Sequence, residues 1–351
     1  MLIDRISTPA LIVDMDAMER NMTKVEHFCA ERGVALRPHY KSHKSTYIAH
    51  LQLERGAKGI CCAKLGEAED LVLSGVEDVL IANQVIDKAK IARLSALANC
   101  TRLTVCVDSA GSVENLQAAA EMQGSTIHCL VEYDVGMNRC GVHAKEECLA
   151  LARLIYSKAN LTFDGIQAYA GNLAHCFDFE KRLAGSIAVE AKLNELKEYI
   201  VASGLEVKEI SGMSTGTIWN RPEGTVYTEA QTGSYIFMDA TYGSMNLKLE
   251  NALFLLCTAI HASDDHIVFD GGIKSLGMDQ NKPYFVEYPD KEIDFNEEHS
   301  AVYAVTGKVG DKARMVPGHC CSTVNMHDWL YLVRGNRVID RIYITSRGKS
   351  E

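Results

Sequence analysis

The chain has 351 residues, 47% of them hydrophobic, with a formal net charge of −10 and a pI near 5.7. This length allows one large domain and a smaller one, and the acidic balance argues against nucleic-acid binding. No apolar run is long enough to span a membrane, and charges at Asp4 and Arg5 interrupt any secretory segment. The twelve cysteines form no C-x-x-C pair, so we expect reduced, mostly buried thiols in a cytoplasmic protein.

Strand-like apolar segments alternate with amphipathic, helix-length segments over the first two thirds of the chain. The predicted strands are Ala10–Asp14, Val34–Arg37, Gly59–Ala63, Val79–Ala82, Leu103–Val107, His128–Tyr133, Phe163–Tyr169, Val207–Ser211 and Ser234–Met238. The predicted helices include Asp16–Arg32, Gly66–Ser74, Ser112–Glu121, Lys145–Ser157 and Glu180–Ser203. This alternation favours a closed (β/α)8 TIM barrel with one strand placed elsewhere. A doubly wound open sheet is the alternative, but no G-x-G-x-x-G follows the first strand.

The pattern changes after Tyr242. The apolar segments become short and are separated by Gly, Asp and Asn, which is typical of an antiparallel β-domain without helices. The predicted strands of this part are Phe254–Ile260, His266–Phe269, Ala301–Val305, Trp329–Val333 and Arg337–Ile344.

The segment Arg37-Pro38-His39-Tyr40-Lys41-Ser42-His43-Lys44 follows the second predicted strand. It places Lys41 among two histidines and a second lysine. An amine crowded by cationic or protonatable neighbours is a better nucleophile toward an aldehyde, as a Schiff-base lysine must be. Taken alone, a basic octapeptide is also typical of a solvated loop.

Polar residues follow the predicted barrel strands, where the active site of a (β/α)8 barrel lies. They are Lys41, Asn83, Asp108, Asp134 to Arg139, Tyr169, Gly212 to Thr217 and Tyr235. The Gly212–Thr217 loop combines glycines with three hydroxyls, so it can present N–H and O–H donors to a phosphate. Without other signals, such a loop is usually a simple turn.

The segment Pro317-Gly318-His319-Cys320-Cys321 predicts a metal site. If it is extended, His319 and Cys321 point to one side and Cys320 to the other. An imidazole beside a thiolate suits zinc, and two protein ligands leave positions for water and substrate. The alternative is a buried thiol beside a core histidine.

The octapeptide resembles the pyridoxal-phosphate lysine motif of the family that holds D-serine dehydratase and D-threonine aldolase. The resemblance runs from Thr8-Pro9-Ala10 to Asn325, with the motifs in the family's order. It implies the alanine-racemase-like (fold type III) plan: a pyridoxal-phosphate-binding barrel, here residues 15–242, and a β-domain, here 1–14 plus 243–351. It also implies a homodimer that acts on a small D-amino acid.

The resemblance further implies roles for single residues. Lys41 carries the cofactor, and Arg139 contacts its pyridine nitrogen. With an arginine beside this nitrogen, the ring is a weaker electron sink than it is with a carboxylate there. Tyr169 lies beside the cofactor, and His175 is the proposed base for the substrate hydroxyl in the aldolases. The implied phosphate-binding residues are Ser214, Thr215, Gly216, Thr217, Gly233, Ser234 and Tyr235.

His319 and Cys321 match the metal ligands of that family, in which dehydratases pair cysteine with zinc and aldolases pair aspartate with Mn or Mg. Cys321 therefore favours a zinc-dependent dehydratase (ammonia-lyase) acting on D-serine or D-threo-3-hydroxyaspartate, giving a 2-keto acid and ammonia. In that reaction the freed Lys41 amine removes the α-proton. The alternatives are a metal-dependent D-threonine or 3-hydroxy-D-aspartate aldolase, an amino-acid racemase, and a non-enzymatic cofactor carrier. The β-domain and the His319–Cys321 pair argue against a carrier.

Overall fold

The computed structural model describes residues 1–220 and 224–351. Its contacts divide the chain into two compact units. The β unit comprises Met1–Val25, Ser42–Ser45 and Ser234–Gly348, and the barrel unit comprises Glu26–Lys41, Thr46–Gly233 and Lys349–Glu351. The domain boundaries predicted at 14/15 and 242/243 stay a prediction.

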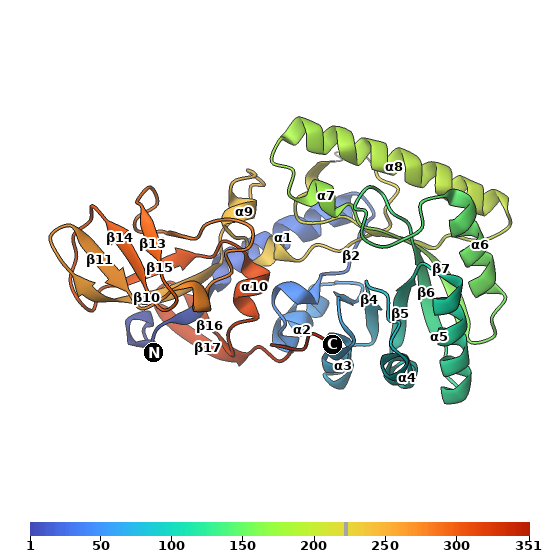
Figure 1. The fold of residues 1–351 in the computed structure, drawn as a ribbon, viewed down its shortest axis with the longest axis horizontal. Helices are drawn as coiled ribbons and strands as arrows, with labels where there is room; N and C mark the ends of the chain where they lie inside the picture. Colours follow the sequence, from blue (N-terminus) through green and yellow to red (C-terminus); the bar gives the residue numbers. More distant parts are fainter. Residues whose placement is uncertain (221–223) are drawn as a thin grey trace. The chain divides into compact units, whose positions relative to one another are not determined.

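The barrel unit is built around an eight-stranded parallel sheet (Figure 1). Its strands are β2 (Ala35–Leu36), β3 (Ile60–Cys62), β4 (Asp78–Ile81), β5 (Arg102–Val107), β6 (Ile127–Glu132), β7 (Leu161–Ala168), β8 (Glu209–Gly212) and β9 (Glu229–Ala230). They follow the order β2-β9-β8-β7-β6-β5-β4-β3. A parallel bridge between His39 and Cys61, with a 2.9 Å bond from Cys61 N to Pro38 O, joins β2 to β3. The sheet is therefore closed, which confirms the predicted barrel and excludes the open doubly wound sheet.

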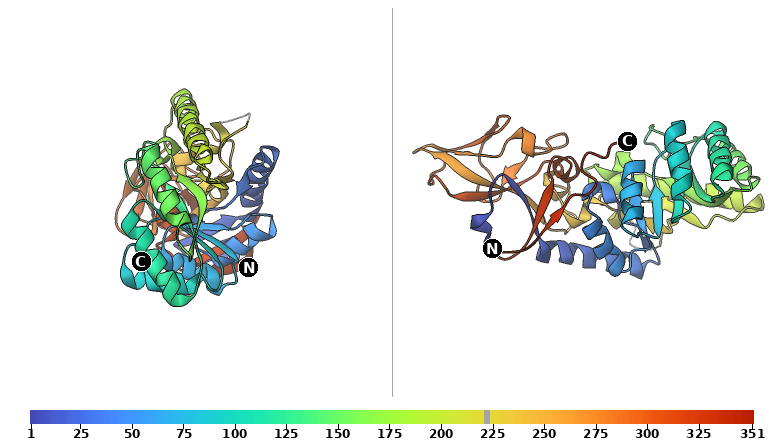
Figure 2. Two further views of the ribbon diagram at one scale, coloured as in Figure 1. Left: turned by 90° about the vertical axis from the view of Figure 1, so that its right-hand side faces the viewer. Right: turned by 90° about the horizontal axis from the view of Figure 1, so that it is seen from below.

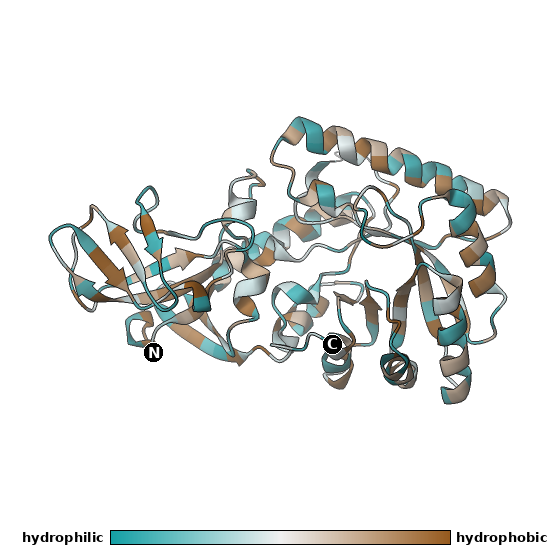
Figure 3. Ribbon diagram, viewed as in Figure 1, coloured by the Kyte–Doolittle hydropathy of each residue, from teal (hydrophilic) through white to brown (hydrophobic). Residues whose placement is uncertain are grey.

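Helices cover the outside of the strands, as the views in Figures 1 and 2 show. They are α2 (Thr46–Glu54), α3 (Leu65–Leu73), α4 (Lys88–Leu97), α5 (Ala110–Gln123), α6 (Lys145–Tyr156), α7 (Gly171–Ala174) and α8 (Phe179–Ala202), and α1 (Met15–Glu31) precedes β2. The five predicted helices are confirmed. Polar and apolar residues alternate along α8 (Figure 3) because it buries only one face, which includes Val189, Leu193 and Leu196.

One predicted barrel strand is wrong. Ser234–Met238 is not a strand, because Ser234–Ile236 forms a 3-10 turn (η4). The last barrel strand is instead the two-residue β9, which pairs with β2 and β8. The apolar residues Tyr235 and Phe237 are fully buried, so their hydrophobicity reports burial and not an extended backbone.

The β unit contains a nine-stranded, mostly antiparallel sheet. Its strands are β1 (Ala10–Asp14), β10 (Leu253–Ala262), β11 (His266–Phe269), β12 (Tyr284–Phe285), β13 (Ile293–Phe295), β14 (Ser300–Tyr303), β15 (Lys312–Val316), β16 (Trp329–Arg334) and β17 (Arg337–Tyr343). The first strand joins this sheet as predicted, antiparallel to β10 and parallel to β16. The expectation of no helices after Tyr242 is wrong, since α10 (Cys320–Val324) lies between β15 and β16; α9 (Ala240–Gly243) precedes β10.

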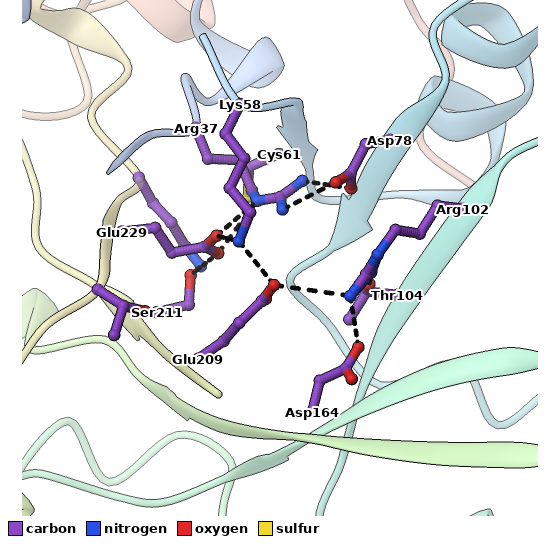
Figure 4. Close-up of polar contacts among 12 residues, drawn as sticks. Arg37, Lys58, Cys61, Asp78, Arg102, Thr104, Asp164, Glu209, Ser211 and Glu229 are labelled. Atoms are coloured by element: carbon purple, nitrogen blue, oxygen red, sulfur yellow. Dashed lines mark hydrogen bonds and ion pairs between the residues drawn. The ribbon is translucent and has the colours of Figure 1, made fainter. Parts of the chain in front are cut away.

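Charged side chains from several barrel strands and from residues beside them form a network of ion pairs (Figure 4). Arg37 is fully buried and donates to Glu229 at 3.0 Å and to Asp78 at 2.7 Å. Lys58 bonds Glu229 at 2.9 Å and Glu209 at 2.6 Å. These ion pairs stabilise carboxylates whose burial without a partner would cost free energy.

In the parts of the chain that the structure describes, no helix combines the length and apolar character needed to cross a bilayer.

Candidate functional site

The carboxyl ends of the barrel strands surround a cavity of about 170 Å³. Four of the side chains predicted from strand-end positions line it: Lys41, Asn83, Arg139 and Tyr169. The other lining residues have no individual role in the prediction from sequence, although His39 belongs to the Lys41 octapeptide; they are His39, Ala63, Ala82, Cys140, Gln167 and Gln231. The position after a barrel strand is thus a useful signal, since Ala63, Ala82 and Gln231 also directly follow strands, whereas Gln167 lies within β7.

The Tyr169 ring lies near both cations of the cavity. Its ring centroid is 5.9 Å from Lys41 Nζ and 5.6 Å from Arg139 Cζ. Lys41 is the middle residue of a 3-10 turn, Tyr40–Ser42, and Tyr40 anchors the turn by donating to Asp70 at 2.7 Å. The cavity therefore brings an amine, a guanidinium and an aromatic face together.

The loop that carries Arg139 is shaped by Asp134. This carboxylate accepts hydrogen bonds from the backbone N–H groups of Gly136, Met137 and Asn138 at 2.7 to 2.8 Å. Gly141 has a φ of +102°, and a Cβ there would lie 2.9 Å from Asp134 N. The segment from Asp134 to Gly141 therefore forms a tight turn, which fixes the backbone position of Arg139.

Glu132, at the end of β6, is a buried carboxylate that the sequence analysis missed. Gln84 Nε2 donates to its Oε2. Burial raises the pKa of Glu132, while the Gln84 bond and the charge of Arg139 lower it, and the net pKa lies above its ordinary value. No local signal separates this residue from an ordinary strand glutamate.

The predicted phosphate loop is buried and internally bonded. Ser214 Oγ lies 3.0 Å from Thr217 Oγ1, and a Cβ on Gly216 would lie 2.0 Å from Ala174 O. Thr217 lines a separate cavity of about 20 Å³ with Tyr227 and others, so the structure does not place the loop among the residues lining the Lys41 cavity.

Thr232 offers a direct test of whether a polar ligand fits. Its Oγ1 is buried and has no hydrogen-bond partner within residues 1–220 and 224–351. It follows Gln231, which lines the cavity. A buried hydroxyl without a partner is costly unless a ligand or water satisfies it. The Lys41 amine, the Arg139 guanidinium and this hydroxyl together fit pyridoxal phosphate.

Three other predicted positions are not among the described side chains that line this cavity. His175 ends α7 and is not among the described side chains that line the cavity. Ser234 and Tyr235 belong to the β unit, where Ser234 Oγ is 3.7 Å from Cys321 Sγ. For Gly233, as for these residues, the cofactor role stays a prediction.

The metal pair lies in the β unit, and its backbone is not extended throughout, because Cys320–Val324 forms the short helix α10. His319 is the N-cap residue of α10, and Cys321 lies in its first turn. The segment is held by Asp239, whose carboxylate accepts from Cys320 N at 3.0 Å. A Cβ on Gly318 would lie 1.9 Å from Asn281 O, so only glycine allows this approach.

Asp279 supplies a partner for His319 that was missed because it lies 40 residues away. His319 Nδ1 is 2.7 Å from Asp279 Oδ2, and Ser322 Oγ donates to Asp279 Oδ1 at 2.6 Å. Burial lowers the pKa of His319, but hydrogen bonds with Cys321 and Asp279 raise it, to about 9. A histidine that is oriented by a carboxylate through one ring nitrogen is typical of metal ligands.

Within residues 1–220 and 224–351, no group of three His, Cys, Asp or Glu side chains could hold a metal ion. The donor set of His319 Nε2 and Cys321 Sγ therefore fits only an open site completed by water or substrate.

Two family models match the chain. Residues 13–241 match the model described as alanine racemase, N-terminal domain, and residues 252–333 match the putative serine dehydratase domain.

Several relatives are similar over nearly their whole length. A 3-hydroxy-D-aspartate aldolase of Paracoccus denitrificans (strain Pd 1222) is 39% identical over 98% of this chain and 93% of its own. A D-threonine aldolase of Arthrobacter sp is 36% identical over 99% of this chain and 94% of its own. A D-threo-3-hydroxyaspartate dehydratase of Delftia sp. (strain HT23) is 26% identical over 91% of this chain and 92% of its own.

A solved structure, the D-threonine aldolase from Filomicrobium marinum, superimposes with a TM-score of 0.95 at 33% identity over 100% of this chain and 99% of that one. The chain therefore belongs to the alanine-racemase-like, fold type III pyridoxal-phosphate family that includes the D-threonine and 3-hydroxyaspartate aldolases and the D-serine dehydratases.

Proposed function

We propose that this protein is a pyridoxal-phosphate- and metal-dependent lyase that cleaves the Cα–Cβ bond of D-3-hydroxy amino acids. Its substrates would be 3-hydroxy-D-aspartate or D-threonine, and its products glycine and an aldehyde. The observation that carries the proposal is the near full-length likeness to aldolases at 36% and 39% identity, against 26% for the dehydratase. Similarity along the whole chain thus favours aldol cleavage over the dehydration that Cys321 alone favoured.

The barrel unit supplies the cofactor site in this proposal. Pyridoxal phosphate, when bound, supplies an electron sink for the electron pair of a breaking bond at the substrate α-carbon. Lys41 Nζ would hold the cofactor covalently, and Arg139 would interact with its ring nitrogen. The Thr232 hydroxyl and the Ser214–Thr217 loop provide donors for its phosphate.

Cleavage also requires two proton movements. A base must take the proton of the substrate hydroxyl, and His175 has this role in our proposal. Lys41 Nζ, when protonated, would deliver a proton to the α-carbon. A divalent cation on His319 Nε2 and Cys321 Sγ would supply Lewis-acid chemistry to the substrate oxygen.

A product assay tests this function. Holoenzyme supplied with Mn²⁺, Mg²⁺ or Zn²⁺ is incubated with D-threonine, 3-hydroxy-D-aspartate, D-serine and their L-forms. We expect glycine and an aldehyde in equal amounts from a D-substrate. Keto acid and ammonia without glycine would refute aldol cleavage.

Removal of the metal should stop turnover. Dialysis against a strong chelator is expected to reduce activity at least about a hundredfold, since charge on the reacting oxygen would lose its stabilisation. The absorbance of the bound cofactor should persist, because its proposed holders lie in the barrel unit. Full activity in the metal-free protein would contradict the proposal.

Dehydration remains a second candidate because of Cys321. Thiolate is a soft ligand that suits zinc, whereas the hard cations Mn²⁺ and Mg²⁺ prefer carboxylate. A Cys321→Asp variant should therefore bind Mn²⁺ or Mg²⁺ more tightly and Zn²⁺ more weakly than the wild type. If it also raises the ratio of glycine to keto acid, Cys321 partitions the two reactions; an unchanged metal preference would argue against its role as a ligand.

The homodimer and the cytoplasmic location stay predictions. Sedimentation velocity of the holoenzyme would test the first.

A further inference from the structure

Two glutamines of the cavity form a reciprocal amide pair. Gln231 Nε2 donates to Gln167 Oε1 at 2.7 Å, and Gln167 Nε2 donates back to Gln231 Oε1 at 3.3 Å. Both side chains line the cavity, and both residues are almost fully buried. The proposed function assigns neither of them a role.

A hydrogen-bond chain connects this pair to the ion pairs in the barrel interior. Gln231 Nε2 lies 2.6 Å from Ser211 Oγ, and Ser211 Oγ lies 2.5 Å from Glu229 Oε1. Glu229 also binds Arg37 and Lys58, as Figure 4 shows. The chain thus runs from a buried carboxylate to the cavity.

The direction of each hydrogen bond in this chain is determined by chemistry. A carboxylate only accepts, so the single hydroxyl hydrogen of Ser211 must be donated to Glu229. Ser211 Oγ can then only accept from Gln231, which must present its NH₂ group there. If Gln231 instead turned its carbonyl oxygen toward Ser211, the Ser211 hydrogen would be donated to Gln231. The oxygens of Ser211 and Glu229 would then face each other without a hydrogen between them.

Glu229 keeps the charge on which this argument depends. Burial raises its pKa, but Arg37 and Lys58 lower it more, and the net pKa lies below its ordinary value. Protonation of Glu229, which would let the chain reverse, is therefore opposed by two cations.

The consequence reaches the cavity. Both hydrogens of Gln231 Nε2 are used, one on Ser211 and one on Gln167. Gln167 Nε2 uses one hydrogen on Gln231, and no second acceptor for it is found within residues 1–220 and 224–351. One N–H of Gln167 thus remains for a ligand in the cavity.

We propose that Ser211 is a positioning residue, which fixes the Gln167–Gln231 pair so that an N–H of Gln167, and not its carbonyl, is offered to an oxygen of the bound cofactor. This inference rests on the proposed function, because the ligand in question is pyridoxal phosphate.

The test measures the dissociation constant and the absorption maximum of bound pyridoxal phosphate at one fixed pH. Ser211→Ala leaves the Arg37–Glu229 ion pair in place but breaks the chain. We expect about tenfold weaker cofactor binding, the effect of one lost hydrogen bond to a charged group, and a displaced absorption band. Gln167→Glu, which presents oxygen in place of the N–H, should weaken binding at least as much.

Asp164→Asn is the matched control. Asp164 is equally buried and pairs with Arg102 at 2.6 Å, but it does not contact the Gln pair or Ser211. It should bind the cofactor as the wild type does. Wild-type affinity and spectrum in Ser211→Ala or Gln167→Glu, or the same loss in Asp164→Asn, would overturn the inference. Absence of a covalent cofactor in the wild type would instead refute the proposed function, and the inference with it.

Discussion

A Lys41→Arg variant should lose lyase activity by at least about a thousandfold, within the range that a single acid–base group contributes. The substitution keeps a cation near the Tyr169 ring, where Lys41 Nζ lies 5.9 Å from the centroid. A guanidinium cannot form the covalent link or exchange protons at neutral pH, so charge alone should not rescue turnover. The measurement is the rate of product formation together with the absorption spectrum of the purified protein, from which the band of the bound cofactor should vanish.

Lys44→Ala is the matched control for this substitution. Lys44 belongs to the same octapeptide, but it is buried in the β unit with its Nζ 3.5 Å from Ser346 O. Its replacement should leave the cofactor band in place. If the band survives in Lys41→Arg and disappears in Lys44→Ala, Lys44 carries the cofactor and the assignment to Lys41 is wrong.

An Arg37→Met variant should lower the free energy of unfolding by about 3–5 kcal/mol, the cost of breaking a buried ion pair on one side. Arg37 and Glu229 are both fully buried, and their ion pair is 3.0 Å long. Removal of the guanidinium leaves Glu229 with Lys58 as its remaining cation. Urea unfolding of both proteins measures the difference.

Arg93→Met is the control for that loss. Arg93 bonds Glu69 at 2.6 Å on the surface, where solvent screens the pair, and its replacement should leave the unfolding midpoint almost unchanged. An Arg37→Met variant that is no less stable than Arg93→Met would contradict the importance of the buried pair.

Acid should reduce the difference between wild type and Arg37→Met. The folded-state pKa of Glu229 lies below the ordinary value of 4.5, because Arg37 and Lys58 outweigh the effect of burial. A lowered carboxyl pKa stabilises the fold above the unfolded-state pKa and loses that contribution as the pH falls through the folded-state pKa. We expect the gap in unfolding free energy to shrink below about pH 4.5; a gap that widens would contradict this sign.

Local pattern was sufficient for most of the barrel. Long apolar strands and amphipathic helices produce periodic patterns that can be read from the sequence. Because the strand ends of a barrel converge, Lys41, Asn83, Arg139 and Tyr169 can be grouped from the sequence alone. The last barrel strand could not be found this way. β9 has only two residues, Glu229 and Ala230, too few for a period to show.

The remaining features depend on contacts that are distant in sequence. Glu229 and Arg37 are separated by 192 positions and Gln167 and Gln231 by 64, and neither pair has a local signature. An extended backbone would place His319 and Cys321 on one side, but no local pattern decides whether the His319–Cys321 segment is extended. In the structure it begins the short helix α10, where Asp239 accepts a hydrogen bond from Cys320 N.

The most direct test of the account is to find which residue carries the cofactor. Purified holoenzyme is treated with borohydride, which makes the covalent link permanent, then digested and mapped by mass spectrometry. The account predicts the pyridoxyl-phosphate mass on the peptide containing Lys41 and on no other. A label on a different lysine, or none in a protein that still turns over substrate, would contradict it.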